Sequence, residues 1–321
     1  MPKVHLIPFQ IEAIAENTFE VPPGIKMIRA RSVWREGFKG ENIVVAVIDT
    51  GCEQGHMDLA GQIIGGYNFT DDFNGDPANF ADNNGHGTHV CGTVAAAENG
   101  DGVVGVAPKA RLLVLKVLTG AGEGTTENIA SAVNYAVRWT GPNGEKVRVI
   151  SMSLGGPDDD LALHSAISNA VQNNIMVVCA SGNEGDGDSE TNEYSFPAAY
   201  PEVVAVGSVN PVKRISSFSN SNGEVDLVAP GEHVVSTYPG NQYAALSGTS
   251  MAAPHVSGAV ALLTDKFESM RGSRLSEPEI FKELLNNTVS LGYPKTLEGN
   301  GLLNLNNKKL EKLKKLIKML G

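Results

Sequence analysis

Short apolar runs alternate with loops rich in glycine and small polar residues, and this alternation limits the fold more than any other feature. The run Ile43–Ile48 is continuously apolar, which is typical of a strand buried on both faces of a parallel sheet. The expected strands are Ile43–Ile48, Arg111–Leu118, Val147–Met152, Ile175–Cys179 and Val203–Val206, and the expected helices are Ile25–Glu36, Thr126–Trp139, His164–Asn174 and Glu277–Asn287. This order predicts an α/β fold of three layers, with a mainly parallel central sheet and helices on both faces.

The composition excludes several classes of function. Hydrophobic residues make up 41% of the 321 and charged residues 19%, as in a soluble globular chain with a sizeable core. The net charge of -11 argues against nucleic acid as a partner, because phosphate binding favours a basic surface. No stretch approaches the roughly 18 apolar residues of a membrane span, and the start shows no secretory apolar region. Cys52, Cys91 and Cys179 lack metal-type spacing, so we expect a cytoplasmic protein with reduced thiols.

The segment Leu246–Gly258 carries the most specific motif in the chain. It places Ser250 at the start of an apolar helical pattern, where unpaired N–H groups and the helix dipole favour negative charge. A bare Gly-Thr-Ser would be read as an ordinary helix cap. The full run Gly-Thr-Ser-Met-Ala-Ala-Pro-His is much rarer, and it resembles the nucleophile motif of the subtilisin-like serine proteases.

Two further motifs extend this resemblance. Asp49 follows the strand Ile43–Ile48 and precedes a glycine, at the strand end where α/β sheets bind ligands. His86 lies between glycines before a helix rich in small residues, and His89 reads as a packing residue because a zinc-type His-Glu-x-x-His is absent. The order Asp, His, Ser is the one known from subtilisin itself. The resemblance therefore spans nearly the whole chain and implies a subtilisin-like fold.

The resemblance implies a role for each of these groups. Ser250 would attack the peptide carbonyl, His86 would take its proton, and Asp49 would fix the His86 tautomer. The side-chain amide of Asn183 and the Ser250 N–H would bind the oxyanion. An extended substrate would pair with two backbone edges and place one side chain in a pocket. The implied edges are Ser153, Leu154 and Gly155 and, opposite them, Gly122, Glu123 and Gly124; the implied pocket walls are Ala180, Ser181 and Gly182.

The resemblance also implies a calcium site. Carboxylate, amide and backbone carbonyl oxygens are the ligands that Ca²⁺ prefers, and Asp58 with the loop 97–103 matches the family's strong site. The implied ligands are Asp58, Ala97, Asn99, Asp101 and Val103. The secreted enzymes add a glutamine, whereas the aligned residue here is Phe19. A solvated acidic loop is the alternative.

Residues 1–20 have no regular pattern of their own and stand where the secreted enzymes carry a signal peptide and a long prodomain. Such a short extension resembles that of the intracellular subtilisins of Bacillus-type bacteria, which keeps the enzyme inactive until it is removed. We expect Leu6, Ile7, Pro8 and Phe9 to lie in the cleft, with Pro8 bending the peptide away from Ser250. A strand that only ties down the terminus is the alternative. The expected division is an inhibitory extension 1–20, a catalytic domain 21–305 and an amphipathic tail 306–321.

The tail and the glycine-rich loops bear on other possible functions of the chain. Leucines recur at helical spacing in the tail, which predicts either a homodimer contact, as expected in this family, or packing on its own domain. Gly120-x-Gly-x-Gly124 differs from the nucleotide-binding Gly-x-Gly-x-x-Gly. A catalytically silent peptide-binding relative is the main alternative. We expect a serine endopeptidase, made as a zymogen, that acts on proteins and peptides.

Overall fold

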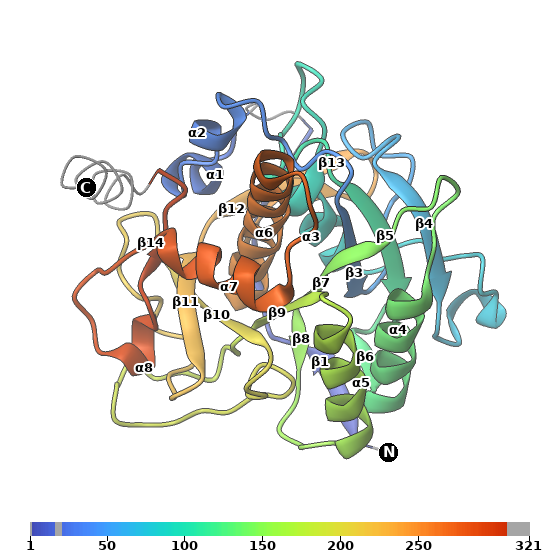
Figure 1. Cartoon of the computed structure of the whole chain (residues 1–321). Helices are drawn as coiled ribbons and strands as arrows, with labels where there is room; N and C mark the ends of the chain where they lie inside the picture. Colours follow the sequence, from blue (N-terminus) through green and yellow to red (C-terminus); the bar gives the residue numbers. More distant parts are fainter. Residues whose placement is uncertain (1, 17–20, 307–321) are drawn as a thin grey trace.

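The computed structural model describes residues 2–16 and 21–306, which form three layers (Figure 1). Within these residues the middle layer is a nine-stranded sheet in the order β14-β15-β11-β10-β9-β7-β3-β5-β4. Neighbouring strands are parallel except β14 with β15. The strands are β3 (Val44–Asp49), β4 (Ile63–Asn68), β5 (Arg111–Lys116), β7 (Val147–Met152), β9 (Met176–Ala180), β10 (Val204–Val209), β11 (Val225–Pro230), β14 (Thr288–Val289) and β15 (Leu302–Leu303). The expected fold class is confirmed.

Helices cover both faces of this sheet. Strand β3 shows why, since successive side chains of a strand point to opposite faces. Val45 and Val47 belong to the core cluster with α3 and α6, whereas Val44 and Ile48 belong to the cluster with α4 and α5. The helices are α1 (Pro23–Met27), α2 (Arg31–Trp34), η1 (Asp72–Gly75), α3 (His86–Ala95), α4 (Thr126–Arg138), α5 (Leu161–Gln172), α6 (Thr249–Arg271), α7 (Glu277–Asn286) and α8 (Lys295–Glu298).

The N-terminal extension contains two strands, although the sequence shows no regular pattern there. Strand β1 (Lys3–Leu6) lies between β6 (Glu123–Thr125) and β8 (Leu154–Gly155). Strand β2 (Gln10–Ala15) extends the hairpin of β12 (Val234–Tyr238) and β13 (Gln242–Ser247). The partners are distant in the sequence, so pairing rather than a local pattern makes these strands.

The expected helix Ile25–Glu36 was wrong as a single helix. It divides into α1 and α2, because Arg29 between them adopts the left-handed region with φ of 63°. The strands and the other helices agree with the expected ones to within a few residues at each end.

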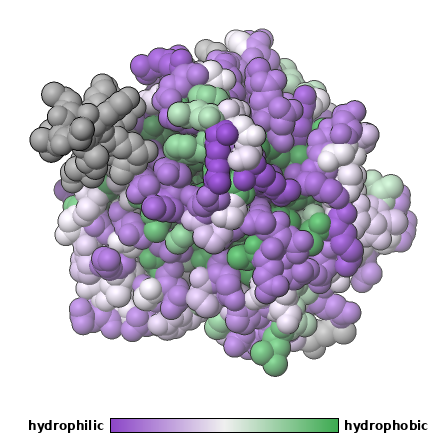
Figure 2. All heavy atoms as spheres, in the orientation of Figure 1, coloured by the Kyte–Doolittle hydropathy of each residue, from purple (hydrophilic) through white to green (hydrophobic). Residues whose placement is uncertain are grey.

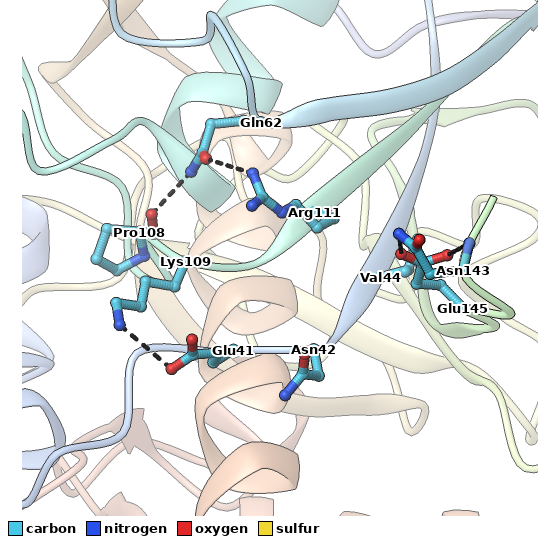
Figure 3. Close-up of a pocket in the computed structure, with 9 residues that line it drawn as sticks. All are labelled: Glu41, Asn42, Val44, Gln62, Pro108, Lys109, Arg111, Asn143 and Glu145. Atoms are coloured by element: carbon cyan, nitrogen blue, oxygen red, sulfur yellow. Dashed lines mark hydrogen bonds and ion pairs between the residues drawn. The ribbon is translucent and has the colours of Figure 1, made fainter. Parts of the chain in front are cut away.

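The outer surface is mainly polar. Figure 2 shows hydrophilic residues over most of one face, with apolar residues scattered among them. Among the helices of the described residues, we find none with the length and apolar character needed to cross a membrane. A polar pocket lies where β3 and β5 begin, and Lys109 pairs there with Glu41 (Figure 3). The catalytic candidates lie at the opposite ends of these strands.

Candidate active site

Asp49 and His86 form a buried pair. Asp49 is the last residue of β3 and His86 the first of α3, and both side chains are almost inaccessible to solvent. The Nδ1 atom of His86 lies 2.8 Å from Oδ1 of Asp49. The same carboxylate oxygen accepts the Thr50 N–H at 2.7 Å. A carboxylate so placed can fix the ring's tautomer and orientation.

Glycine at position 87 allows the two segments to approach closely. A Cβ on Gly87 would lie 2.2 Å from the Gly51 carbonyl oxygen, so a larger residue would push α3 away from the β3 loop. The hydroxyl of Thr50 accepts the Gly87 N–H at 2.9 Å across the same contact. The glycine beside His86 thus allows the backbone of α3 to contact the loop that follows β3.

Ser250 is the second residue of α6 and is fully buried. Its hydroxyl donates to the Ser153 carbonyl at 3.3 Å, while the Ser153 hydroxyl donates to the Ser250 carbonyl at 2.9 Å. Within the described residues, Nε2 of His86 has no hydrogen-bond partner. The structure therefore joins Asp49 to His86 by a hydrogen bond and leaves Ser250 bonded to the substrate edge instead.

Asn183 uses both ends of its side-chain amide. Its oxygen accepts the Thr249 N–H at 2.9 Å and the Thr249 hydroxyl at 2.8 Å, which fixes the amide beside the start of α6. Its nitrogen donates to the Pro8 carbonyl at 2.5 Å. A Cβ on Gly248 would lie 2.9 Å from this nitrogen, so the amide faces the turn that leads to Ser250.

The two expected substrate edges hold the extension. Strand β1 pairs antiparallel with both, with Val4 opposite Gly124 and Leu6 opposite Leu154. The Leu6 N–H donates to the Gly122 carbonyl at 2.9 Å. Each edge therefore already forms main-chain hydrogen bonds of the kind that an extended peptide makes.

Of the next three residues of the extension, Ile7 is buried, and Pro8 and Phe9 reach the catalytic candidates. Ile7 is 3% exposed and lies in the same core cluster as Ala180 of the expected pocket. The Pro8 carbonyl is the one held by Asn183. The Phe9 ring lies against the His86 ring, with centroids 4.9 Å apart.

Comparison with known proteins agrees with this geometry. The family model described as the subtilase family matches residues 40–307, most of the chain. The chain belongs to the subtilase family. It is 53% identical to the major intracellular serine protease of Bacillus subtilis (strain 168), over 94% of this chain and 93% of the relative. It is 51% identical to the intracellular serine protease of Paenibacillus polymyxa, over 94% of this chain and 91% of the relative.

Subtilisin DY of Bacillus licheniformis shares 43% identity, over 89% of this chain and 97% of the relative. This subtilase is therefore a serine protease, as the sequence predicted. Its resemblance to the intracellular members is also confirmed, since two relatives at about half identity carry that word in their names.

The expected calcium ligands gather around Asp58, a fully buried residue of this subtilase. Its carboxylate accepts the Asn99 amide and the Val103 N–H, both at 2.9 Å, and its carbonyl accepts the Ala97 N–H at 2.8 Å. Asp101, more exposed, donates its N–H to the Asn99 amide oxygen. No cationic side chain of the described residues pairs with Asp58, so these residues fit a cation.

Within residues 2–16 and 21–306, no three His, Cys, Asp or Glu side chains gather as a metal site. A calcium ion at Asp58 would therefore depend mainly on carbonyl and amide oxygens. Phe19 lies outside the described residues, as does the tail from residue 307 onward.

The remaining motif residues have packing roles in this subtilase. The His89 ring bonds to the carbonyl oxygens of Val234 and Ala244, and burial lowers its pKa to about 3, so the ring is neutral. Cys52, Cys91 and Cys179 are free and buried.

Two residues near the site were missed from the sequence. Ser195 lies beside the substrate edge, since a Cβ on Gly155 would be 2.3 Å from its hydroxyl oxygen. The sequence carries no local signal for that approach. Lys116 is fully buried beside the Asp49 loop. A charge within the apolar run Arg111–Leu118 was a signal that could have found it.

Proposed function

We propose that this subtilase is an endopeptidase that hydrolyses proteins and peptides inside the cell through Asp49, His86 and Ser250. The observation that carries the proposal is the buried Asp49–His86 hydrogen bond, which leaves Nε2 of His86 without a partner among the described residues. An imidazole held in this way can accept the proton of a neighbouring hydroxyl.

In the proposed reaction each of these groups has a defined role. The Ser250 oxygen attacks the peptide carbonyl, while His86 takes the hydroxyl proton and later gives it to the leaving amine. The Asn183 amide nitrogen and the Ser250 N–H stabilise the oxyanion of the tetrahedral intermediate, because both are fixed before the charge develops. Water then hydrolyses the acyl-enzyme on Ser250 by the same proton transfers.

We further propose that residues 1–20 keep the enzyme latent. Support comes from the position of Pro8, whose carbonyl holds the donor that the oxyanion needs, and of Phe9, which lies against His86. The Ser250 hydroxyl is turned to the Ser153 carbonyl, so it lacks the base. These contacts support an extension that excludes a substrate from the site, and a strand that only holds the terminus in place is the alternative.

Labelling with a fluorophosphonate tests both proposals, since this reagent reacts with an activated serine. We compare the full chain, the chain lacking residues 1–18, and that shorter chain carrying Ser250→Ala. Strong labelling and peptide hydrolysis only in the shorter chain with Ser250 are the expected result. Equal activity with and without residues 1–18 would reject latency. A shorter, folded chain that binds peptides without labelling would identify a silent relative.

Calcium binding at Asp58 and homodimer formation are also part of the proposal. The buried carboxylate of Asp58, which forms no ion pair with a cationic side chain of the described residues, supports the first. If Ca²⁺ binds, Asp58, Asn99 and the carbonyls of loop 97–103 would hold it, and its charge would fix this loop. The amphipathic sequence of the tail 306–321 supports the second, and sedimentation of the chain with and without that tail tests it.

A further inference from the structure

Lys116 is a fully buried cation at the catalytic end of the sheet. It is the last residue of β5, and it lies opposite Asp49 on β3 and Asn68 on β4. Its side chain is 0% exposed. Burying an ammonium group is costly unless it is paired and fully hydrogen-bonded, so its partners identify what the charge is used for.

Four oxygens surround the Lys116 Nζ atom. The carbonyl oxygens of Thr50 and Leu118 lie at 2.7 and 2.9 Å, and Oδ1 of Asn83 at 2.9 Å. Oδ2 of Asp72 lies at 3.0 Å and forms an ion pair with it. These oxygens come from four separate stretches of chain, so one cation binds several loops at once.

The first of these contacts leads to the catalytic carboxylate. Thr50 accepts from Lys116 through its carbonyl and donates its own N–H to Asp49 Oδ1. The Asp49 carbonyl in turn accepts the Val117 N–H at 2.9 Å, in the residue that follows Lys116. The loop that aims Asp49 at His86 is thereby fixed to the end of β5.

The contact with Asp72 leads to the substrate edge. The Asp72 carboxylate accepts the Gly120 N–H at 2.8 Å and the Asn83 amide at 3.1 Å. The Asn84 amide donates to the Gly120 carbonyl at 3.0 Å, two residues before Gly122. Burial raises the pKa of Asp72, but the hydrogen bonds from Lys116, Asn83 and Gly120 leave it below its usual value, so Asp72 is an anion.

We infer that Lys116 is a positioning residue for hydrolysis, whose buried charge holds the Asp49 loop, the segment before His86 and the substrate edge Gly122–Gly124 in one fixed arrangement. This inference rests on the proposed function. The catalytic carboxylate and the edge that aligns the substrate belong to separate loops, and Lys116 contacts the chain leading to each. Its loss therefore affects both turnover and substrate alignment.

Lys116→Met tests this role, because methionine keeps most of the volume and removes the charge and the donors. Asp72→Asn is a milder second variant, since the Asp72 side chain is 21% exposed and asparagine keeps its shape. Arg148→Met is the matched control. Arg148 is also a buried cation in an ion pair, with Glu268 at 2.6 Å, but it lies at the start of β7, away from the catalytic end.

All variants are prepared as the full chain and activated by limited proteolysis of the extension after folding. Thermal unfolding gives the temperature range in which each is folded. Within that range, kcat and KM are measured for an extended tetrapeptide, which uses both edges, and for a single-residue ester, which uses neither.

For Lys116→Met we expect kcat/KM on the tetrapeptide to fall about 100-fold, shared between kcat and KM, because small misplacements of reacting groups cost that much. The fall on the ester is smaller and in kcat alone. Asp72→Asn is expected to lower the activity on both substrates, with kcat/KM on the tetrapeptide falling about 10-fold. Arg148→Met is expected to lower the stability and to leave kcat and KM unchanged.

Parental kcat and KM in folded Lys116→Met would overturn the inference and leave Lys116 a stabilising residue. If that variant does not fold, Asp72→Asn decides, and parental kinetics there overturn it as well. An activated parent that hydrolyses neither substrate counts instead against the proposed function.

Discussion

Asn183 shows how one side chain serves two purposes at the residue scale. Its oxygen accepts two hydrogen bonds from Thr249, which fixes the orientation of the amide, and its nitrogen donates to the Pro8 carbonyl. A donor fixed in advance stabilises a developing charge without reorganising during the reaction. In the proposed function, catalysis and latency would compete for this donor, which now binds Pro8.

Replacing Asn183 separates these purposes. In the activated enzyme, Asn183→Ala is expected to lower kcat about 10²- to 10³-fold with little change in KM, a loss that has been measured for subtilisin itself. Asn183→Asp keeps the acceptor for Thr249 and loses the donor, so it is expected to be at least as slow. Steady-state kinetics on a tetrapeptide check this. An Asn183→Asp enzyme with parental kcat would contradict the assignment.

At the scale of elements, the two strands of the extension differ in how they are held. Strand β2 adds to the hairpin β12–β13, and Glu12 pairs there with His233 and accepts the Ser247 hydroxyl at 2.5 Å. Because the side chain of His233 is 61% exposed, the pair is screened by solvent. The pairing of β1 with two substrate edges therefore holds the extension more strongly than Glu12 does.

Glu12→Gln tests whether the pairing of β1 holds the extension more strongly than the Glu12–His233 pair does. We expect the basal peptide hydrolysis of the intact chain to rise no more than about 5-fold, because an exposed ion pair contributes roughly 0–1 kcal/mol. Glu16→Gln, on the same extension, is the control and is expected to leave the rate unchanged. Electrophoresis confirms that the extension is uncut. A rise of several hundred-fold would mean that β2, not β1, carries latency.

Some elements could be predicted from the sequence and others could not. The apolar run of β3 and the rare motif at Ser250 are local patterns, so the parallel sheet and the family could be predicted. Strands β1 and β2 could not, because their pairing depends on distant edges. The approach of Ser195 to Gly155 and the hydrogen bonds of Lys116 depend on the tertiary structure, so they could not be predicted either. The lysine itself could be noticed, because it interrupts an apolar run.

The proposed calcium ion beside Asp58 would stabilise the whole molecule. In a Ser250→Ala background, which prevents self-digestion, we expect EDTA to lower Tm by about 4 °C, the effect of losing an ion present at about 100 times its Kd. Asp58→Asn is expected to lower Tm and to abolish the response to EDTA. Calorimetry with and without added CaCl₂ checks both. An undiminished EDTA response in Asp58→Asn would place the ion elsewhere.

Stability of the whole molecule depends on pH through Asp226. Burial, opposed by the Ala205 N–H and reinforced by the charges of Glu224 and Glu277, raises its pKa from 3.8 to about 7. Between these values the native protein holds a proton that the unfolded chain has released. Stability therefore falls as pH rises through this window, and the loss is complete above about pH 7.

Asp226→Asn removes that charge and keeps an acceptor for the Ala205 N–H. In the Ser250→Ala background, we expect Tm at pH 8 to rise by several degrees and the gain to shrink towards pH 5. Some pH dependence remains, since burial also raises the pKa of Glu277 to about 7. Calorimetry at the two pH values measures this. The same gain at both would exclude titration of Asp226 as its cause.

Under the proposed latency, the position of β1 between β6 and β8 has a consequence for how the enzyme becomes active. While covalently attached, the segment competes for the cleft at an effective concentration in the millimolar range. A single cut leaves the segment chemically intact but reduces its concentration to that of the enzyme. Dilution then empties the cleft, so the specific activity of freshly cleaved enzyme will rise as the same solution is diluted.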